Sequence, residues 1–195
     1  MLWIISGPSS VGKSTFLASP RCREVTGLGP ETPVFFGFDV AGSDTQLTSV
    51  DCLFHYNLLR PAALFTKRKK CAQTFAQRLR HSIGLSRPAD LEQMQRAAAD
   101  FRSDPAWAGI IAQGGEKRAV LLIAERDHIL DRVRARRQIE AHLEESYQAS
   151  QWLALYEWLD LPLLYRAWYA ELLACGIEPV LLDSHDPEFR PLPLP

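Results

Sequence analysis

The stretch Gly7-Pro-Ser-Ser-Val-Gly-Lys-Ser14 decides the fold class, because it matches the pattern GxxxxGK[ST] at every fixed position. An apolar run, residues 2–6, precedes it, and a helix-compatible run, residues 13–18, follows it. Glycines let the backbone turn tightly and approach a phosphate group without a Cβ in the way. The N–H groups of such a turn surround an anion. Residues 7–14, the phosphate loop, therefore predict a strand, an anion-binding turn and a helix in succession.

Two side chains of the phosphate loop have their own expected roles. Lys13 can reach the β- and γ-phosphates of a nucleoside triphosphate, and the Ser14 hydroxyl can ligate Mg²⁺. We therefore expect ATP and Mg²⁺ as cofactors, with Lys13 as a catalytic cation and Ser14 as the metal ligand; guanine in place of adenine is not excluded. The expected nucleotide-binding residues here are Gly7, Ser9, Ser10, Val11, Gly12, Lys13, Ser14 and Thr15.

Four more short apolar runs, bounded by turn residues, predict further strands at 34–38, 50–56, 119–124 and 179–182. Strands buried on both faces of a parallel sheet have continuous apolar sequences. Helix-compatible segments lie between them, at 62–83, 89–101 and 129–142, and an aromatic-rich pair follows at 143–159 and 162–175. Strands that alternate with helices predict an α/β fold with helices on both faces of the sheet.

The expected architecture is the three-layer P-loop NTPase fold, with five parallel strands in the order 2-3-1-4-5 and a helical lid at about 126–145. A single domain spans residues 1–186. The tail, 187–195, holds four prolines, which predict an extended or disordered segment. Only residues 40–49 separate the second and third expected strands, which is barely enough for a parallel crossover with a helix. Either that connection is irregular or one of the two strands is misplaced.

The composition sets limits on compartment and partners. A chain of 195 residues can bury one core, and its net charge of -1 offers no general field for a polyanion or a membrane surface. Its four cysteines form no CxxC pair, which indicates reduced thiols in a cytoplasmic protein, and the apolar run 2–5 has no basic leader. We expect neither a nucleic acid nor a membrane as partner. A monomer and a homodimer both fit.

A cluster of arginines follows the fourth expected strand. Arg132 and Arg136 are four residues apart and share a helix face, and Arg137 is next to them. Phosphoryl transfer spreads negative charge over oxygen atoms that guanidinium groups stabilise. The structural alternative is a solvated basic helix balanced by the glutamates that follow it. The segment alone does not decide between the two.

At these residues the sequence resembles a known group of enzymes. The loop GPSSVGKST is similar to the loops of small-molecule and nucleotide kinases, guanylate kinase among them. The arginine cluster, the tyrosines after it and the run Pro179-Val-Leu-Leu-Asp183 are similar to the C-terminal half of the deoxynucleoside kinase and thymidylate kinase group. The resemblance covers residues 1–18 and 120–186. It implies an ATP-dependent kinase that phosphorylates a hydroxyl or phosphate of a small molecule.

The resemblance also implies roles for single residues. Arg132, Arg136 and Arg137 would be lid arginines on the donor phosphates, the first two catalytic and the third nucleotide-binding. Asp183 and Ser184 would lie near the adenine.

The acceptor side is less defined. Asp39 directly follows the second expected strand, where such kinases carry an acidic residue, so we expect it to activate or orient the acceptor, with Asp44 and Asp51 as alternatives. Asp51 would open the third expected strand and point away, unless that strand ends there. His55 could contact the acceptor, although a buried structural histidine is the commoner outcome. The chain lacks the Glu-Pro-Val and Asp-Arg elements of nucleoside kinases, so the acceptor need not be a nucleoside.

Other patterns favour plainer interpretations. The basic run Lys67-Arg-Lys-Lys70 is typical of a solvated face. The aromatic residues between 152 and 169 recur at helical spacing and predict helix packing. Two functional alternatives remain: a P-loop NTPase coupled to a partner protein, which would need an apolar run ending in Asp, and a nucleotide sensor. Both would use the phosphate loop without a small-molecule acceptor.

Overall fold

The computed structural model describes residues 1–8, 10–36, 46–51, 91–139 and 160–193 of the chain. These ranges hold five strands and six helices. The strands are β1 (Leu2–Gly7), β2 (Val34–Phe36), β3 (Gln46–Asp51), β4 (Lys117–Ile123) and β5 (Pro179–Asp183). The helices are α1 (Lys13–Ala18), α2 (Pro20–Thr26), α4 (Leu91–Phe101), α5 (Pro105–Ala112), α6 (Arg126–Ile139) and α8 (Leu161–Ala174).

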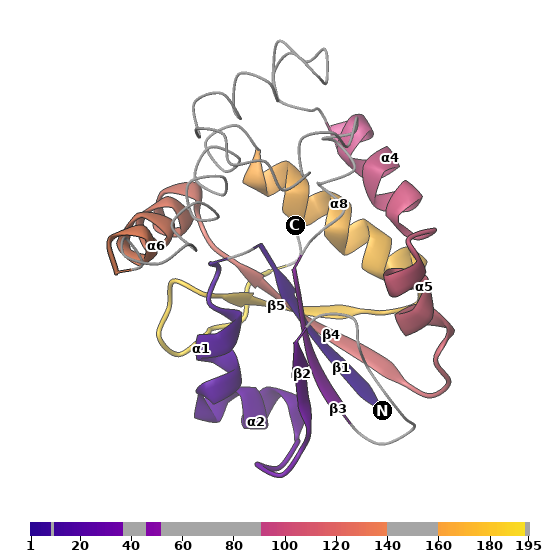
Figure 1. The fold of residues 1–195 in the computed structure, drawn as a ribbon, viewed down its shortest axis with the longest axis horizontal. Coiled ribbons are helices and arrows are strands. Elements are labelled where there is room, and N and C mark those ends of the chain that lie inside the picture. Colours follow the sequence, from indigo (N-terminus) through magenta and orange to yellow (C-terminus); the bar gives the residue numbers. More distant parts are fainter. Residues whose placement is uncertain (9, 37–45, 52–90, 140–159, 194–195) are drawn as a thin grey trace.

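The strands pair in parallel in the order β2-β3-β1-β4-β5. Figure 1 shows α1 and α2 on one face of the sheet and α4, α5 and α8 on the other, with α6 near the end at which β1 leads into α1. Because all strands are parallel, their carboxyl ends meet at one edge, where ligands bind in open α/β sheets. We refer to it as the carboxyl edge.

The sequence led us to expect a regular five-stranded fold with a helical lid, and the structure corrects this expectation. The centre of the sheet consists of three strands of six or seven residues, β3, β1 and β4, whereas β2 contributes three residues and borders β3 alone. The third strand starts at Gln46 rather than at residue 50. Helix α6 is described to Ile139, and the rest of the expected lid lies outside the described residues.

The third strand was expected at residues 50–56 because the actual strand, β3, is not a run of apolar residues. Its sequence is Gln-Leu-Thr-Ser-Val-Asp, and Gln46 and Thr48 are both buried. In contrast, the predicted positions of β1, β4 and β5 agree with the structure to within two residues, because these strands are almost continuously apolar. Hydrophobic runs in the sequence therefore located the strands with apolar buried side chains, β1, β4 and β5. They did not locate β3, which buries polar side chains.

Helix α8 begins and ends at residues that are typical of helix ends. Asp160 caps its first turn, where its Oδ1 accepts a hydrogen bond from the Leu163 amide, and Pro162 lies in that turn. At the other end Gly176, with φ of 74°, donates to the Leu173 carbonyl, while Ile177 donates to the Leu172 carbonyl. These two backbone hydrogen bonds, together with a glycine in the left-handed conformation, form the Schellman motif.

Helix α8 supports the sheet beneath the phosphate loop. Trp168 is fully buried, and its Nε1 donates to the Ser6 Oγ over 2.8 Å, one residue before the loop. Phe101 and Trp107 pack on the Trp168 ring at centroid distances of 6.1 and 5.1 Å. Tyr165 is also buried, and Tyr169 is partly buried against the same core, so the packing role predicted for the aromatic residues is confirmed for these three members of α8. The other predicted members, at positions 152, 156 and 158, lie outside the described residues.

The proline-rich tail is docked rather than free over the part that the structure describes. Leu192 donates to the Leu181 carbonyl and Asp183 donates to the Arg190 carbonyl, each over 2.9 Å, so the tail runs back along β5. Phe189 is buried and meets the Phe16 ring of α1 edge-on at 5.1 Å. The tail thereby packs against the helix that follows the phosphate loop. Within the described ranges, no helix is both long and apolar enough to cross a membrane.

One buried carboxylate ties α8 to the end of α4. The Glu171 side chain is 3% exposed and takes two hydrogen bonds from the half-exposed Arg102 guanidinium, at 2.9 and 2.7 Å. We predict that Arg102→Ala lowers the free energy of unfolding by about 1–3 kcal/mol, because it leaves a buried carboxylate without its cation. Urea denaturation measures this.

The matched control is Glu24→Ala, which removes the exposed Arg21–Glu24 pair of α2. Exposed pairs contribute little, so its effect should stay below about 0.5 kcal/mol. Equal effects for the two variants would contradict the assignment of Glu171 as a buried structural anion.

Candidate functional site

The phosphate loop has an unusual backbone conformation. Gly7, Ser10 and Gly12 have φ values of 153°, 65° and 110°, and Ser9 lies outside the described residues. Ser10 is one of two described non-glycine residues with positive φ. Such conformations cost free energy and concentrate at functional sites. Left-handed residues interspersed in a turn direct successive N–H groups toward one place, which is the geometry of an anion-binding nest.

Lys13 adds a positive charge to the loop. Its Nζ donates to the carbonyl oxygens of Gly7 and Pro8, over 3.1 and 2.9 Å, so the side chain folds back across the loop from the first turn of α1. The next two residues, Ser14 and Thr15, are exposed. A hydroxyl that is open to solvent next to this ammonium fits the metal-ligand role expected of Ser14.

A Mg²⁺ ion at Ser14 would need further ligands. Among the residues that the structure describes, no group of three or more His, Cys, Asp or Glu side chains could hold a metal ion.

Arg132 connects α6 with the phosphate loop. Its Nη1 donates to the Val11 carbonyl, and its Nη2 donates to the Ser184 carbonyl over 3.1 Å. A Cβ built on Gly12 would lie 2.6 Å from the same Nη1, so the guanidinium rests directly against the loop backbone. Burial lowers the pKa of Arg132, but arginine stays protonated in proteins. The loop therefore has two cations beside it, Lys13 and Arg132.

The other two arginines of the expected cluster are less defined. Arg136 and Arg137 follow in α6, and their side chains lie outside what the structure describes. Their assignment to the donor phosphates stays a prediction.

The end of β5 lies next to Arg132. The resemblance had implied that residues at this strand end lie near the adenine of the nucleotide. Ser184 is buried, and its amide donates to the Ile123 carbonyl over 2.8 Å. Its Oγ has no hydrogen-bond partner among the residues that the structure describes. Asp183 Oδ1 accepts from the His185 amide over 2.8 Å. The His185 ring meets the His128 ring of α6 edge-on, with centroids 4.5 Å apart. This corner joins α6 to the end of β5 beside the phosphate loop.

The position of Asp51 agrees with the alternative that its strand ends at this residue. Asp51 is the last residue of β3 and is in register with Gly7, the last residue of β1. The rule that the carboxyl ends of strands face the site therefore applies to Asp51, because its strand lies earlier in the sequence than expected. Asp39, Asp44 and His55 lie outside the described residues, as does the basic run 67–70, so their predicted roles stay predictions.

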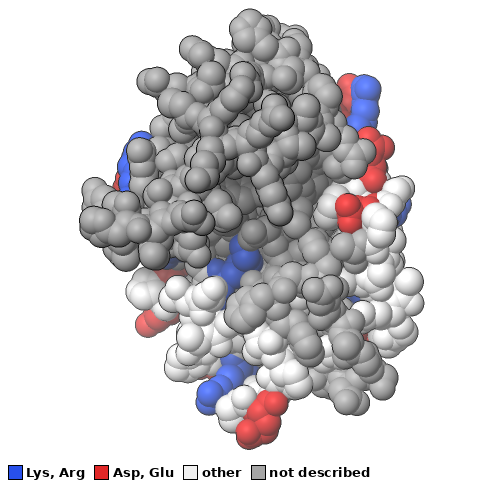
Figure 2. All heavy atoms as spheres, viewed as in Figure 1, with Lys and Arg blue, Asp and Glu red and all other residues white. Residues whose placement is uncertain are grey.

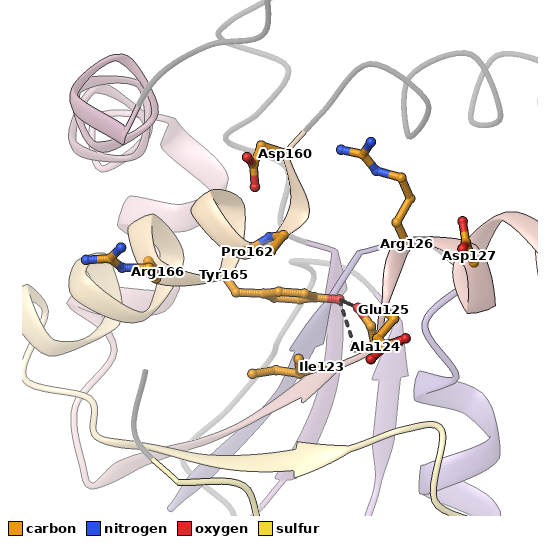
Figure 3. Close-up of a pocket in the computed structure, with 9 residues that line it drawn as sticks. All are labelled: Ile123, Ala124, Glu125, Arg126, Asp127, Asp160, Pro162, Tyr165 and Arg166. Atoms are coloured by element: carbon orange, nitrogen blue, oxygen red, sulfur yellow. Dashed lines mark hydrogen bonds between the residues drawn. The ribbon is translucent and has the colours of Figure 1, made fainter.

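A cleft that the sequence did not indicate lies at the end of β4. It has a volume of about 790 Å³, within the range of small-molecule sites. The Tyr165 hydroxyl fixes its base, because it accepts from the Ala124 amide and donates to the Ala124 carbonyl, over 3.1 and 3.2 Å (Figure 3). Its lining residues are Ile123, Ala124, Glu125, Arg126, Asp127, Asp160, Pro162, Tyr165 and Arg166.

On the face shown in Figure 2, the charged side chains of the described residues lie in a few small, separate groups of either sign. Assignment of a function therefore depends on the local groups at the carboxyl edge. No family model matches the chain, and searches of curated proteins and solved structures give no match.

Contact between Gly12 and Arg132 gives a first prediction for the site. Gly12→Ala places a methyl group in the position of the guanidinium and puts a side chain on a backbone with φ of 110°. We therefore expect it to lower the free energy of unfolding by about 1–3 kcal/mol. Gly27→Ala is the control, since Gly27 has φ of 68° and open space around it, and should cost only the left-handed backbone, about 1 kcal/mol.

The clash itself is measured by a double-mutant cycle. Arg132→Ala should cost less stability in the Gly12→Ala background than in the wild type, because the contact is already disturbed. Additive effects would show that the guanidinium does not lie against the loop in solution.

Titration of His128 gives a second prediction. Burial, the charge of Arg132 and His185 together lower the pKa of His128 below its usual 6.5, against an opposite effect of Asp183 and Asp131. The unfolded chain then binds the proton more readily, so this residue reduces the free energy of unfolding as pH falls from 6.5 through the lowered pKa. Wild type should lose more stability than His128→Gln between about pH 7.5 and pH 5. Parallel losses in the two proteins would contradict this.

Proposed function

We propose that the protein is an ATP-dependent phosphotransferase that phosphorylates a small molecule at the carboxyl edge of its sheet. The observation that carries the proposal is the phosphate loop, with left-handed residues around a turn that Lys13 crosses and Arg132 braces. A loop with two cations and converging N–H groups suits a chain of phosphates better than any neutral ligand.

Each group has a role in the proposed reaction. The loop amides and Lys13 would hold the β- and γ-phosphates, and Arg132 would stabilise the charge that spreads over the transferred group. Ser14 would bind Mg²⁺, which neutralises phosphate charge. Asp51 ends β3 in register with Gly7, and in the proposed reaction it would orient the metal or the acceptor. Asp39 stays a second candidate for the acceptor.

The position of Asp51 also favours the main alternative, a P-loop NTPase coupled to a partner protein. A strand that ends in Asp next to the strand of the phosphate loop is the feature such a protein would need. The cleft at the end of β4 favours the kinase, because a partner-coupled NTPase needs no second small-molecule site. Free thiols at Cys22 and Cys175 fit our proposal that the protein works in the cytoplasm, where ATP is abundant.

The test is ATP consumption by the purified protein with Mg²⁺ and a mixed panel of nucleosides, nucleoside monophosphates and hydroxylated metabolites. We predict stimulation by one compound class. Lys13→Ala should reduce it by about 10²-fold or more. The melting temperature should change little, because this lysine is only partly buried and its Nζ is bonded to the carbonyl oxygens of Gly7 and Pro8 rather than buried in the core.

Lys117→Ala is the control, because this lysine lies at the amino end of β4, away from the carboxyl edge. Stimulated consumption that survives in Lys13→Ala would remove the phosphate loop from the reaction. Tight ATP binding with slow hydrolysis that no compound stimulates would favour the partner-coupled NTPase or the sensor.

A further inference from the structure

The cleft at the end of β4 begins next to the phosphate loop. β1 and β4 are paired up to Ser6 and Leu121, and a Cβ on Gly7 would lie 2.9 Å from the Leu122 carbonyl oxygen. Ile123, the next residue of β4, lines the cleft. A molecule in the cleft would therefore lie on the strand adjacent to the one that carries the loop, at the same carboxyl edge.

Two helices begin at this cleft, and each starts with acidic residues of the chain. Asp160 accepts a hydrogen bond from the first turn of α8. Glu125 precedes α6, where its carbonyl accepts from the Ile129 amide, and Asp127 lies in the first turn. The positive ends of both helices, which would otherwise attract an anionic ligand, thus already have carboxylates beside them.

The charges around the cleft are unfavourable for a phosphorylated ligand. Glu125, Asp127 and Asp160 contribute three negative charges, and Arg126 and Arg166 contribute two positive ones. In Figure 3, Arg166 lies at the opposite end of the cleft from Asp127. A phosphate dianion would meet a surplus of carboxylates, whereas hydroxyl and ammonium groups can donate hydrogen bonds to them.

We propose that this cleft binds the phosphoryl acceptor, and that the acceptor is an uncharged or cationic molecule with hydroxyl groups, not a phosphate monoester. The proposal rests on the proposed function and specifies its substrate class. Asp127 and Asp160 accept hydrogen bonds from acceptor hydroxyl or ammonium groups, while Ile123, Pro162 and the base of the cleft contact its apolar parts. The acceptor hydroxyl attacks the γ-phosphorus, the bond from that phosphorus to the bridging oxygen breaks, ADP leaves, and the hydroxyl proton passes to solvent or a carboxylate.

The experiment compares matched pairs of compounds in the ATP-consumption assay. Each pair consists of an unphosphorylated compound (a nucleoside, a sugar or an amino sugar) and the monophosphate of the same compound. We expect stimulation by unphosphorylated members alone. Asp127→Asn/Asp160→Asn should lower kcat/KM for the stimulating compound at least about tenfold and leave the KM for ATP unchanged, because both charge-assisted bonds are weakened. Asparagine caps a helix as well as aspartate does, so α8 should still form.

Glu24→Gln, which neutralises an exposed carboxylate of α2 away from the cleft, is the control and should retain full activity. Stimulation by monophosphates would overturn the substrate class and leave the phosphotransferase standing. Stimulation by hydroxyl compounds that the double variant does not weaken would overturn the site. If the protein binds ATP through Lys13 but no compound of the pairs stimulates ATP consumption, the assignment of the cleft as the acceptor site is wrong. If the wild-type protein does not bind ATP at all, the proposed function itself is wrong.

Discussion

The contact of the Arg132 guanidinium with two backbone carbonyls organises the carboxyl edge. One carbonyl belongs to Val11 in the phosphate loop and the other to Ser184 after β5, so a single side chain from α6 joins segments from the two ends of the chain. Only glycine at position 12 leaves room for this approach. The same cation that braces the loop is then available to phosphate oxygens, since guanidinium has five N–H donors. Structural support and expected chemistry thus depend on one group.

Support for the loop also comes from the opposite face of the sheet. Trp168 of α8 bonds to Ser6 directly before the loop, and Tyr165, one turn earlier, fixes the backbone of Ala124 at the end of β4. The strand that carries the loop and the strand that borders the cleft are therefore held by the same helix. A donor site and an acceptor site built on adjacent strands of one rigid sheet would hold two reactants in a fixed relation, which is the main contribution of an enzyme to phosphoryl transfer.

How much the sequence predicted depended on the source of each signal. The phosphate loop, β1, β4 and both ends of α8 follow from local residues, because glycines, prolines and apolar runs act within a few positions. The start of β3 could not be found in this way, since Gln46 and Thr48 are polar and become buried only when β1 and β2 flank them. That shift moved Asp51 from the start of a strand to its carboxyl end. The cleft was also missed, because Asp127 and Asp160 are brought together only when α6 and α8 pack around the end of β4.

The central claim is that the backbone amides of the phosphate loop bind the phosphates of a nucleotide, and hydrogen–deuterium exchange measures those amides directly. On addition of ATP and Mg²⁺, residues 10–15 should exchange more slowly, together with the segments around Arg132 and Ser184 that are bonded to each other. Exchange at residues 105–112, which form helix α5, should not change. Unaltered exchange in residues 10–15 at nucleotide concentrations typical of cells would contradict the account.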